Sequence, residues 1–482
     1  MNNRKAPSAN GVSRRDFLKT GALSSFALGS GAFIKGCSPG GTAGGSIKGT
    51  AKNVIFLVSD GMSMGTLTMA DQMTRRRDGR TSNWIRLYEQ QRVNRGVMDM
   101  ASLDSIVTDS AAAAASWGCG HRINNGALCM GPGGEIYPTI LETYRDAGKA
   151  TGLVTTAEIT HATPAGFSVN IPSRYMGEEI ADQYLEREYD LLMGGGNRHF
   201  SASRRSDDKD LYAEFASKGY HIARKKSGLA NLQNDGGKLL GVFANGHLPY
   251  TTDQVSIPDL QRDVPTLAEM SSLAMDRLST NTDGFILQIE GGRVDHAAHS
   301  NDVAGLLFDQ MAFDDAIGAV LDFTDGRDDT LVIITSDHGN ANPGLNGHNN
   351  PNARFDSIAG FKHTNDWILS ELDESSTVSQ VRERVEEATR LQISSREAEA
   401  LISAMQGNYE TLYQPRNGTS SVMGTILANY TGVNWIGSMH TSDYVELASM
   451  GPGSQSLSYF TRNTDLFDLM VEVAGVEVSP AV

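Results

Sequence analysis

Three apolar stretches of the sequence each end in side chains that can bind a cation. NVIFLVSDGM places Asp60 directly after its apolar run, FILQIEGG places Glu290 there, and TLVIITSDHGN ends in Asp337 and His338. Each stretch is typical of a buried strand, and the carboxyl ends of parallel strands meet at one edge of a sheet, where ligands bind. An Asp before Gly is as easily a turn residue, but three independent strand ends are hard to explain as turns. We therefore expect these side chains to converge.

Further candidate metal ligands follow in EGGRVDHAAHS and SMHTSDYVEL. Asp295 and His299 are four residues apart, so on a helix they share a face and can hold one ion. The alternative is an exposed helical pair, but the position just after Glu290 favours ligation. His440 is a lone histidine, which is more often structural than a ligand. Carboxylate and imidazole ligands without thiolate suit zinc, with magnesium at an all-oxygen position. More candidates are present than one ion needs, and paired metals suit phosphoryl transfer.

The segment TDSAAAAASW offers a different kind of reactive group. Alanine is the strongest helix former, so residues 111–115 predict a helix that packs closely against a neighbour. Ser110 then lies at the helix start, where a serine commonly caps the helix by accepting a bond from a backbone N–H. The same place suits a nucleophile or an anion site, because a helix N-terminus is positive. The ten residues alone favour the cap.

Composition and charge narrow the class of protein. The chain has 482 residues, 39% of them hydrophobic, with 51 glycines and a formal net charge of −16, which is typical of a globular, loop-rich protein. Residues 1–37 are basic, so the acidic charge lies in the remainder. Nucleic-acid binding needs a basic face, so we expect no nucleic-acid partner.

The N-terminus predicts export. SRRDFLK, Ser13 to Lys19, is a twin-arginine pattern, and a weakly apolar stretch too short and polar to span a membrane follows it. Residues 1–37 are therefore an export signal that ends at Cys37, a possible lipid-attachment site, and residues 38–50 are a flexible tether. We expect a periplasmic or cell-surface protein. Cys119 and Cys129 either pair there or stay as free thiols.

The remaining chain alternates apolar runs with amphipathic segments, which predicts an α/β fold. We expect a three-layer sandwich with a large, mostly parallel central sheet in a domain over residues 51–482. Residues 341–435 lack apolar strand patterns and contain charged, amphipathic helical patterns. They are predicted to be an inserted helical subdomain.

With these residues in place, the chain resembles the alkaline phosphatase family, whose members are metal-dependent phosphomonoesterases. The motifs that carry the resemblance occur in the family's order between residues 53 and 448: NVIFLVSDGM, VTDSAAAAASWGCG, TTAEITHATPAGFSVNIPSR, LMGGGNRHF, LQIEGGRVDHAAH, VIITSDHGN and SMHTSDYVEL. The resemblance implies that Ser110 is a nucleophile that is transiently phosphorylated. Arg174 would grip two phosphate oxygens through its planar fork, and Asp109 would orient it. It also implies a homodimer.

The resemblance further implies two zinc ions and a third metal, usually magnesium. The first zinc would be held by Asp295, His299 and His440. The second would be held by Asp60, Asp337 and His338, and would contact Ser110. The third metal would be held by Asp60, Thr163 and Glu290.

Two positions depart from the best-known bacterial pattern of the family. His161 replaces an Asp and His296 replaces a Lys, as in the animal-type enzymes. An imidazole in place of a carboxylate makes the third site less suited to magnesium, so zinc or cobalt there is conceivable. Both histidines are expected to lie near the substrate and to act through water rather than as ligands.

Two rival functions remain open from the sequence. One is a phosphodiesterase or sulfatase of the same superfamily, whose members tend to carry Thr or a modified Cys as nucleophile. The other is a non-catalytic, metal-stabilised surface protein that kept the fold. The presence of Ser110, Arg174 and every predicted zinc ligand argues against both.

Overall fold

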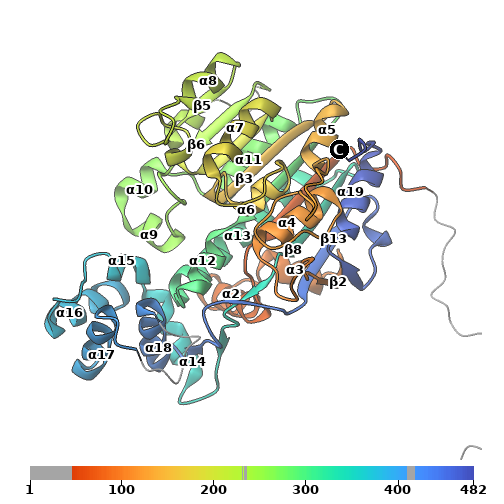
Figure 1. The fold of residues 1–482 in the computed structure, drawn as a ribbon. Helices are drawn as coiled ribbons and strands as arrows, with labels where there is room; N and C mark the ends of the chain where they lie inside the picture. The colour runs from red at the N-terminus through yellow and green to blue at the C-terminus, as the bar shows by residue number, and fades with distance from the viewer. Residues whose placement is uncertain (1–45, 231, 233–235, 410–417, 482) are drawn as a thin grey trace, which may run out of the picture. The chain divides into compact units, whose positions relative to one another are not determined.

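The computed structural model describes residues 46–230, 232, 236–409 and 418–481 (Figure 1). The predicted export signal, Cys37 and most of the tether lie outside the described residues. Residues from Ile47 to Val482 form one compact unit. Among the described residues, every helix is too short or too polar to cross a membrane.

A ten-stranded sheet forms the centre of this unit, in the order β14-β2-β13-β8-β1-β7-β3-β4-β6-β5. Its strands are β1 (Asn53–Ser59), β2 (Asn94–Asp99), β3 (Ala150–Glu158), β4 (Leu191–Gly195), β5 (His221–Ala223), β6 (Leu239–Val242), β7 (Phe285–Gly291), β8 (Thr330–Ser336), β13 (Val445–Met450) and β14 (Phe460–Arg462). Only β13 runs against its neighbours, and it lies between β2 and β8. The sheet is therefore mostly parallel, as predicted.

Helices cover both faces of the sheet. Along β1, Ile55 and Leu57 pack into one hydrophobic cluster, whereas Val54, Phe56 and Val58 pack into another, because successive side chains of a strand point to opposite faces. The first face is covered by α11 (Leu267–Leu278) and α13 (Val303–Thr324). The second is covered by α5 (Ile140–Asp146), α6 (Ala162–Gly166) and α19 (Asp465–Ala474). The predicted three-layer α/β sandwich is confirmed.

Further helices and short strands connect the elements named so far. Of these, the helices that precede residue 300 are α2 (Met64–Asp78), α3 (Asn83–Glu89), α4 (Ser110–Cys119), α7 (Gly177–Arg187), α8 (Leu211–Ser217), α9 (Thr251–Ser256), α10 (Pro258–Asp263) and α12 (Arg293–His299). The two-residue strands are β9 (Gly339–Asn340), β10 (Gly344–Leu345), β11 (Val433–Asn434) and β12 (His440–Thr441).

Between residues 341 and 435 the described chain is largely helical. Its helices are α14 (Pro351–Ser357), α15 (Asn365–Leu369), α16 (Val378–Thr389), α17 (Ser395–Met405) and α18 (Thr419–Thr431). They gather in one group at the lower left of Figure 1. Asp302 ties this group to the start of α13. One carboxylate oxygen accepts the backbone N–H groups of Ala304 and Gly305, and the other accepts that of Asn365.

Candidate metal centre and active site

The three predicted strand ends lie side by side. The strand β1 pairs in parallel with both β7 and β8, so all three reach the same edge of the sheet. Asp60 directly follows β1, Asp337 directly follows β8, and Glu290 is the second-last residue of β7. The fully buried side chains of Asp60, Glu290 and Asp337 therefore meet at the carboxyl edge, as expected.

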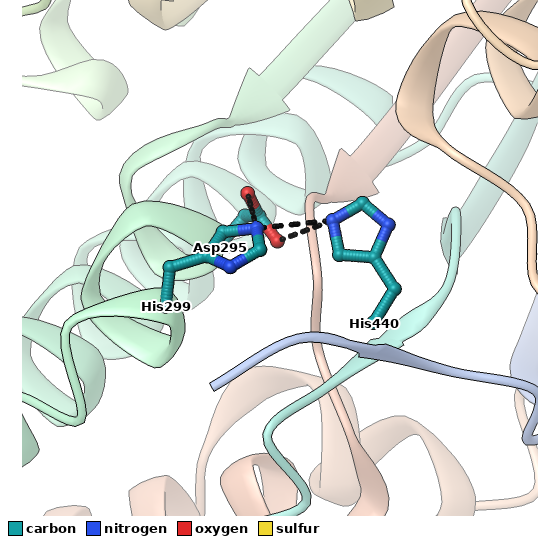
Figure 2. A group of neighbouring side chains, drawn as sticks. All are labelled: Asp295, His299 and His440. Carbon is teal, nitrogen blue, oxygen red and sulfur yellow. Dashed lines mark hydrogen bonds and ion pairs between the residues drawn. The ribbon is translucent and has the colours of Figure 1, made fainter. Parts of the chain in front are cut away.

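A first group consists of Asp295, His299 and His440 (Figure 2). The first two lie on α12, and His440 comes from β12. The Nε2 atoms of the two imidazoles are 3.1 Å apart, and the Asp295 carboxylate lies 3.3 Å from His299 Nε2 and 3.6 Å from His440 Nε2. The structure thus brings His440 to the pair that shares the helix face.

The hydrogen bonds of these two histidines fix their tautomers. His299 Nδ1 lies 2.7 Å from the carbonyl oxygen of Ser438, and His440 Nδ1 lies 3.0 Å from that of Thr108. A carbonyl oxygen only accepts, so each Nδ1 carries a proton and each Nε2 is the nitrogen left for a metal. Burial, with His338 nearby, lowers the pKa of His440 to about 4, which keeps this ring neutral. Two such nitrogens that face each other are the arrangement of metal ligands.

A second group consists of Asp60, Asp337 and His338, and Ser110 joins it. His338 Nε2 lies 3.1 Å from Asp337 Oδ2 and 3.6 Å from Asp60 Oδ1. Ser110 Oγ lies 3.2 Å from the same nitrogen, and Ser110 is 1% exposed. A buried hydroxyl that faces a carboxylate and imidazole cluster is placed for activation by a bound cation.

The structure corrects the capping interpretation of Ser110. The helix α4 does begin at Ser110, but its N-cap is Asp109, whose Oδ1 accepts the backbone N–H of Ala112 at 2.9 Å. Because the neighbouring carboxylate satisfies that donor, the Ser110 hydroxyl is free to face the metal group instead.

Asp109 also holds Arg174. Its Oδ2 accepts from Arg174 Nη1 at 3.0 Å and from the backbone N–H of Gly126 at 3.0 Å. The carbonyl oxygen of Gly126 in turn accepts the backbone N–H of Arg174 at 2.7 Å. A side chain held at both its base and its tip is pre-positioned for a bidentate contact with an oxyanion.

A third group lies on the other side of Asp60. It contains Asp60, His161 and Glu290, and Thr163 Oγ1 donates to Asp60 Oδ2 at 3.4 Å. Asp60 therefore faces the second group with one oxygen and the third with the other. The second carboxylate oxygen of Glu290, Oε2, accepts a bond from Thr155.

The donor atoms of these groups fit cations. Asp60 Oδ1, Glu290 Oε1 and Asp337 Oδ2 are buried and have no hydrogen-bond partner among the described residues. Burial and the neighbouring carboxylates of Asp337 and Asp295 raise the pKa of Asp60 well above its usual range, and burial raises that of Glu290 to about 7. Buried carboxylates without partners are costly unless a cation neutralises them.

His161 and His296 lie beside the third group. Arg174 Nη2 is 3.2 Å from His161 Nε2, and Arg293 Nη1 is 3.1 Å from His296 Nδ1. Arginine only donates, so each contacted nitrogen accepts, and the proton lies on His161 Nδ1 and on His296 Nε2. His161 Nδ1 is 3.9 Å from the unpaired Glu290 Oε1. This tautomer is consistent with a role through water.

Several supporting residues were not predicted from the sequence. Asn340 donates to Asp295 Oδ1 at 2.6 Å, Thr155 binds Glu290, and Asn125 accepts the backbone N–H of Asp109 at 3.0 Å. The ring of His247 packs against that of His296 in a tilted arrangement, with centroids 4.1 Å apart. Its signal was available, because it follows β6, a further strand that ends at the same edge.

The two remaining cysteines are buried, free thiols. Cys119 ends α4, and Cys129 Sγ lies 3.0 Å from the carbonyl oxygen of Gly166. Of the two states that the sequence left open, the structure has the unpaired one.

Comparisons with known proteins identify the family of the chain. The sequence model of the alkaline phosphatase family matches residues 51–476. Alkaline phosphatase 4 of Bacillus subtilis is 31% identical over 436 residues, which cover 88% of this chain and 89% of that protein. The alkaline phosphatase of Escherichia coli is 31% identical over 332 residues, which cover 60% of this chain and 70% of that protein.

Solved structures have the same fold. The crystal structure of Thermus thermophilus alkaline phosphatase matches with a TM-score of 0.82 at 34% identity and covers 91% of this chain and 96% of its own. A cold-active alkaline phosphatase from Shewanella matches with a TM-score of 0.73 at 25% identity, over 88% of this chain and 99% of its own. The chain belongs to the alkaline phosphatase family and is a hydrolase of phosphate monoesters.

Proposed function

We propose that the chain hydrolyses phosphate monoesters through a phosphoserine formed on Ser110. Ser110 Oγ would attack phosphorus, so that a bond forms between Oγ and phosphorus while the bond to the leaving alcohol oxygen breaks. Water would then hydrolyse the phosphoserine and release inorganic phosphate. The observation that carries this proposal is the position of Ser110 Oγ, 3.2 Å from His338 Nε2 and next in sequence to the Asp109 that holds Arg174.

Arg174 would bind two non-bridging oxygens of the phosphoryl group. Its guanidinium is mostly buried, with 13% of the side chain exposed, and Asp109 keeps it in one orientation. A planar fork matches two oxygens of a phosphate, and a lysine would offer only a point charge. Arg174 thus orients the phosphorus toward Ser110.

Two zinc ions fit the first two groups. The first group, Asp295, His299 and His440, supplies two imidazole lone pairs and a carboxylate, and the second supplies His338, Asp60 and Asp337 with the hydroxyl of Ser110. When bound, zinc stabilises charge on the attacking and leaving oxygens and lowers the pKa of a bound hydroxyl or water.

A magnesium ion fits the third group. Its available donors are oxygens of Asp60, Thr163 and Glu290, because the hydrogen bond from Arg174 leaves the proton of His161 on Nδ1. Hard oxygen donors favour magnesium. If Arg174 turns to a bound phosphate, the proton of His161 can move to Nε2, and Nδ1 becomes available as a ligand. Zinc or cobalt would then replace magnesium in the third group. Metal analysis of the purified protein should give two zinc and one magnesium per chain.

The deciding assay compares a monoester with a diester. We expect p-nitrophenyl phosphate to be hydrolysed much faster than its bis ester, and Ser110→Ala to lose activity and phosphoenzyme while it keeps its zinc. A preference for the diester would favour the phosphodiesterase alternative. Bound metal without hydrolysis of any ester would favour a non-catalytic surface protein.

We also propose export by a twin-arginine route, with residues 1–37 as signal and Cys37 as a possible lipid anchor, and a homodimer. Replacement of Arg14 and Arg15 by Lys should leave active protein in the cytoplasm. Cys37→Ser should release the protein from a membrane fraction if Cys37 is lipidated. Light scattering of the purified protein tests the dimer, since a monomeric mass would contradict it.

A further inference from the structure

A third histidine, His247, lies beside His161 and His296. The ring centroids of His247 and His296 are 4.1 Å apart, and that of His161 lies 5.6 Å from His247 and 5.4 Å from His296. His161 contacts Arg174, so the three half-buried rings form one cluster beside the proposed phosphate-binding arginine. They form one wall beside the site.

The tautomer of His247 is fixed by the backbone. The backbone N–H of Glu158 donates to His247 Nδ1 at 3.1 Å, so Nδ1 is unprotonated and the ring carries its proton on Nε2. His296 has the same tautomer, because Arg293 donates to its Nδ1. In the described part of the chain, neither Nε2–H has a protein acceptor. Two half-buried imidazole donors without a protein acceptor therefore lie on adjacent rings.

The position of His247 is rigid. Its partner Glu158 is 5% exposed and is bound by Arg198 at 2.8 Å and by His199 at 3.2 Å. The residue before it, Gly246, accepts the backbone N–H of Gly196 at 2.8 Å, directly after β4. One backbone hydrogen bond thus holds the ring at Nδ1, and another holds the residue before it. His247 therefore loses little conformational entropy when a ligand binds.

We propose that His247 is a substrate-binding residue, which with His296 donates hydrogen bonds to the oxygen atoms of a polyhydroxylated leaving group. The proposal rests on the proposed monoesterase function. Arg174 already matches the phosphoryl oxygens, so two neutral donors farther out suit hydroxyl oxygens better than a further anion. Glycerol and sugar phosphates have such leaving groups, whereas p-nitrophenol offers only a weakly accepting nitro group.

The test compares two polyhydroxylated esters with p-nitrophenyl phosphate in the same variant. In His247→Ala we expect KM for glycerol 2-phosphate and for glucose 6-phosphate to rise about fivefold, the effect of one lost hydrogen bond. The kinetic constants for p-nitrophenyl phosphate should stay unchanged, as should the metal content. His247→Gln keeps an N–H donor and should restore at least half of the lost affinity.

A matched control is His221→Ala on the distant strand β5, where His221 Nε2 contacts the carbonyl oxygen of Gly228. This variant should leave KM unchanged for the polyhydroxylated esters and for p-nitrophenyl phosphate. Three results in His247→Ala would overturn the proposal. They are an equal rise in KM for the polyhydroxylated esters and for p-nitrophenyl phosphate, a loss of metal, and an unchanged KM for the polyhydroxylated esters. If the unmodified protein hydrolyses no monoester at all, the proposed function itself fails, and the two failures are thereby distinguished.

Discussion

His299 and His440 face each other with their Nε2 atoms 3.1 Å apart, and each ring donates from Nδ1 to a backbone carbonyl oxygen. Both Nε2 atoms therefore point to one place beside the Asp295 carboxylate, where one cation can bind all three side chains. The site is thus arranged for bound metal, and a backbone carbonyl behind each ring maintains this arrangement.

Removal of metal should make the stability of the protein depend on pH. Without metal, burial raises the pKa of Glu290 from 4.5 to about 7, and that of Asp60 rises as well. At these two carboxyls the folded state then binds more protons than the unfolded state between those values, so their contribution to stability is fully present below about pH 4.5 and is lost as the pH rises toward 7. We expect Tm of chelator-treated protein to fall from pH 5 to pH 8 and zinc with magnesium to restore it. An apoprotein whose Tm rises over this range would contradict this expectation.

Arg174→Lys should lower kcat/KM for p-nitrophenyl phosphate by about 10- to 100-fold, because one charged hydrogen bond to the phosphoryl group is lost. Inhibition by inorganic phosphate should weaken in parallel. Zinc content should be unchanged, since Arg174 belongs to none of the metal groups. Unaltered phosphate affinity would remove Arg174 from the binding role.

Asp109→Asn should separate the two functions of this side chain. The single amide oxygen can still cap α4 by accepting from Ala112, but the amide nitrogen that replaces Oδ2 cannot accept from Arg174 or from the backbone N–H of Gly126, so Arg174 is no longer held. We expect Tm to stay within a few degrees while KM rises several-fold. Asp109→Ala loses both contacts and should also cost about 1 kcal/mol of stability, as measured by urea unfolding. Equal Tm values for the two variants would show that the cap contributes nothing.

Thr155→Val should weaken the third metal site alone. The substitution keeps the shape of the side chain and removes the hydroxyl that donates to Glu290. Activation by added magnesium should need a concentration about tenfold higher, as expected for loss of a partner behind a metal ligand. Thr151→Val on the same strand, whose hydroxyl binds Asp190 at 3.1 Å, is the matched control and should leave magnesium activation unaltered. Equal effects would indicate a general weakening of β3.

Gly118→Ala should destabilise the nucleophile helix strongly. A Cβ at Gly118 would lie 1.9 Å from the carbonyl oxygen of Gly166 on α6. Backbone cannot give way as a side chain does, so we expect a loss of about 3 kcal/mol in urea unfolding. Ser116→Ala, a small change at a buried position of the same helix, should cost about 1 kcal/mol or less. A Gly118→Ala protein as stable as the parent would show that α4 and α6 can move apart.

The strands and the metal-binding candidates could be predicted because their signals are local. An apolar run that ends in a carboxylate identifies both a strand such as β1 and its ligand Asp60, and parallel topology then places Asp60 beside Asp337. There was little reason to predict His440 as a ligand, because nothing near it in sequence reveals that it faces His299. The family resemblance supplied that pairing.

The supporting contacts could not be predicted, because they join residues far apart in sequence through geometry alone. Thr155 reaches Glu290 because β3 and β7 pair with those two residues in register. The ten residues around Ser110 favoured a cap there, and only the fold reveals that Asp109 caps α4 with one oxygen. The contact of its other oxygen with Arg174 was expected from the family resemblance. His247 is the exception, because its place after the strand β6 was a usable signal.

The single antiparallel strand has a consequence for synthesis of the chain on the ribosome. The strand β13 enters between β2 and β8, which are made long before it, and His440 is made only a few residues earlier. Until then the nascent sheet lacks an internal strand, and the first group has Asp295 and His299 on α12 but lacks His440. Insertion of β13 and completion of this group therefore coincide once residues 440–450 have been made. A chain that stops short of residue 440 would have neither.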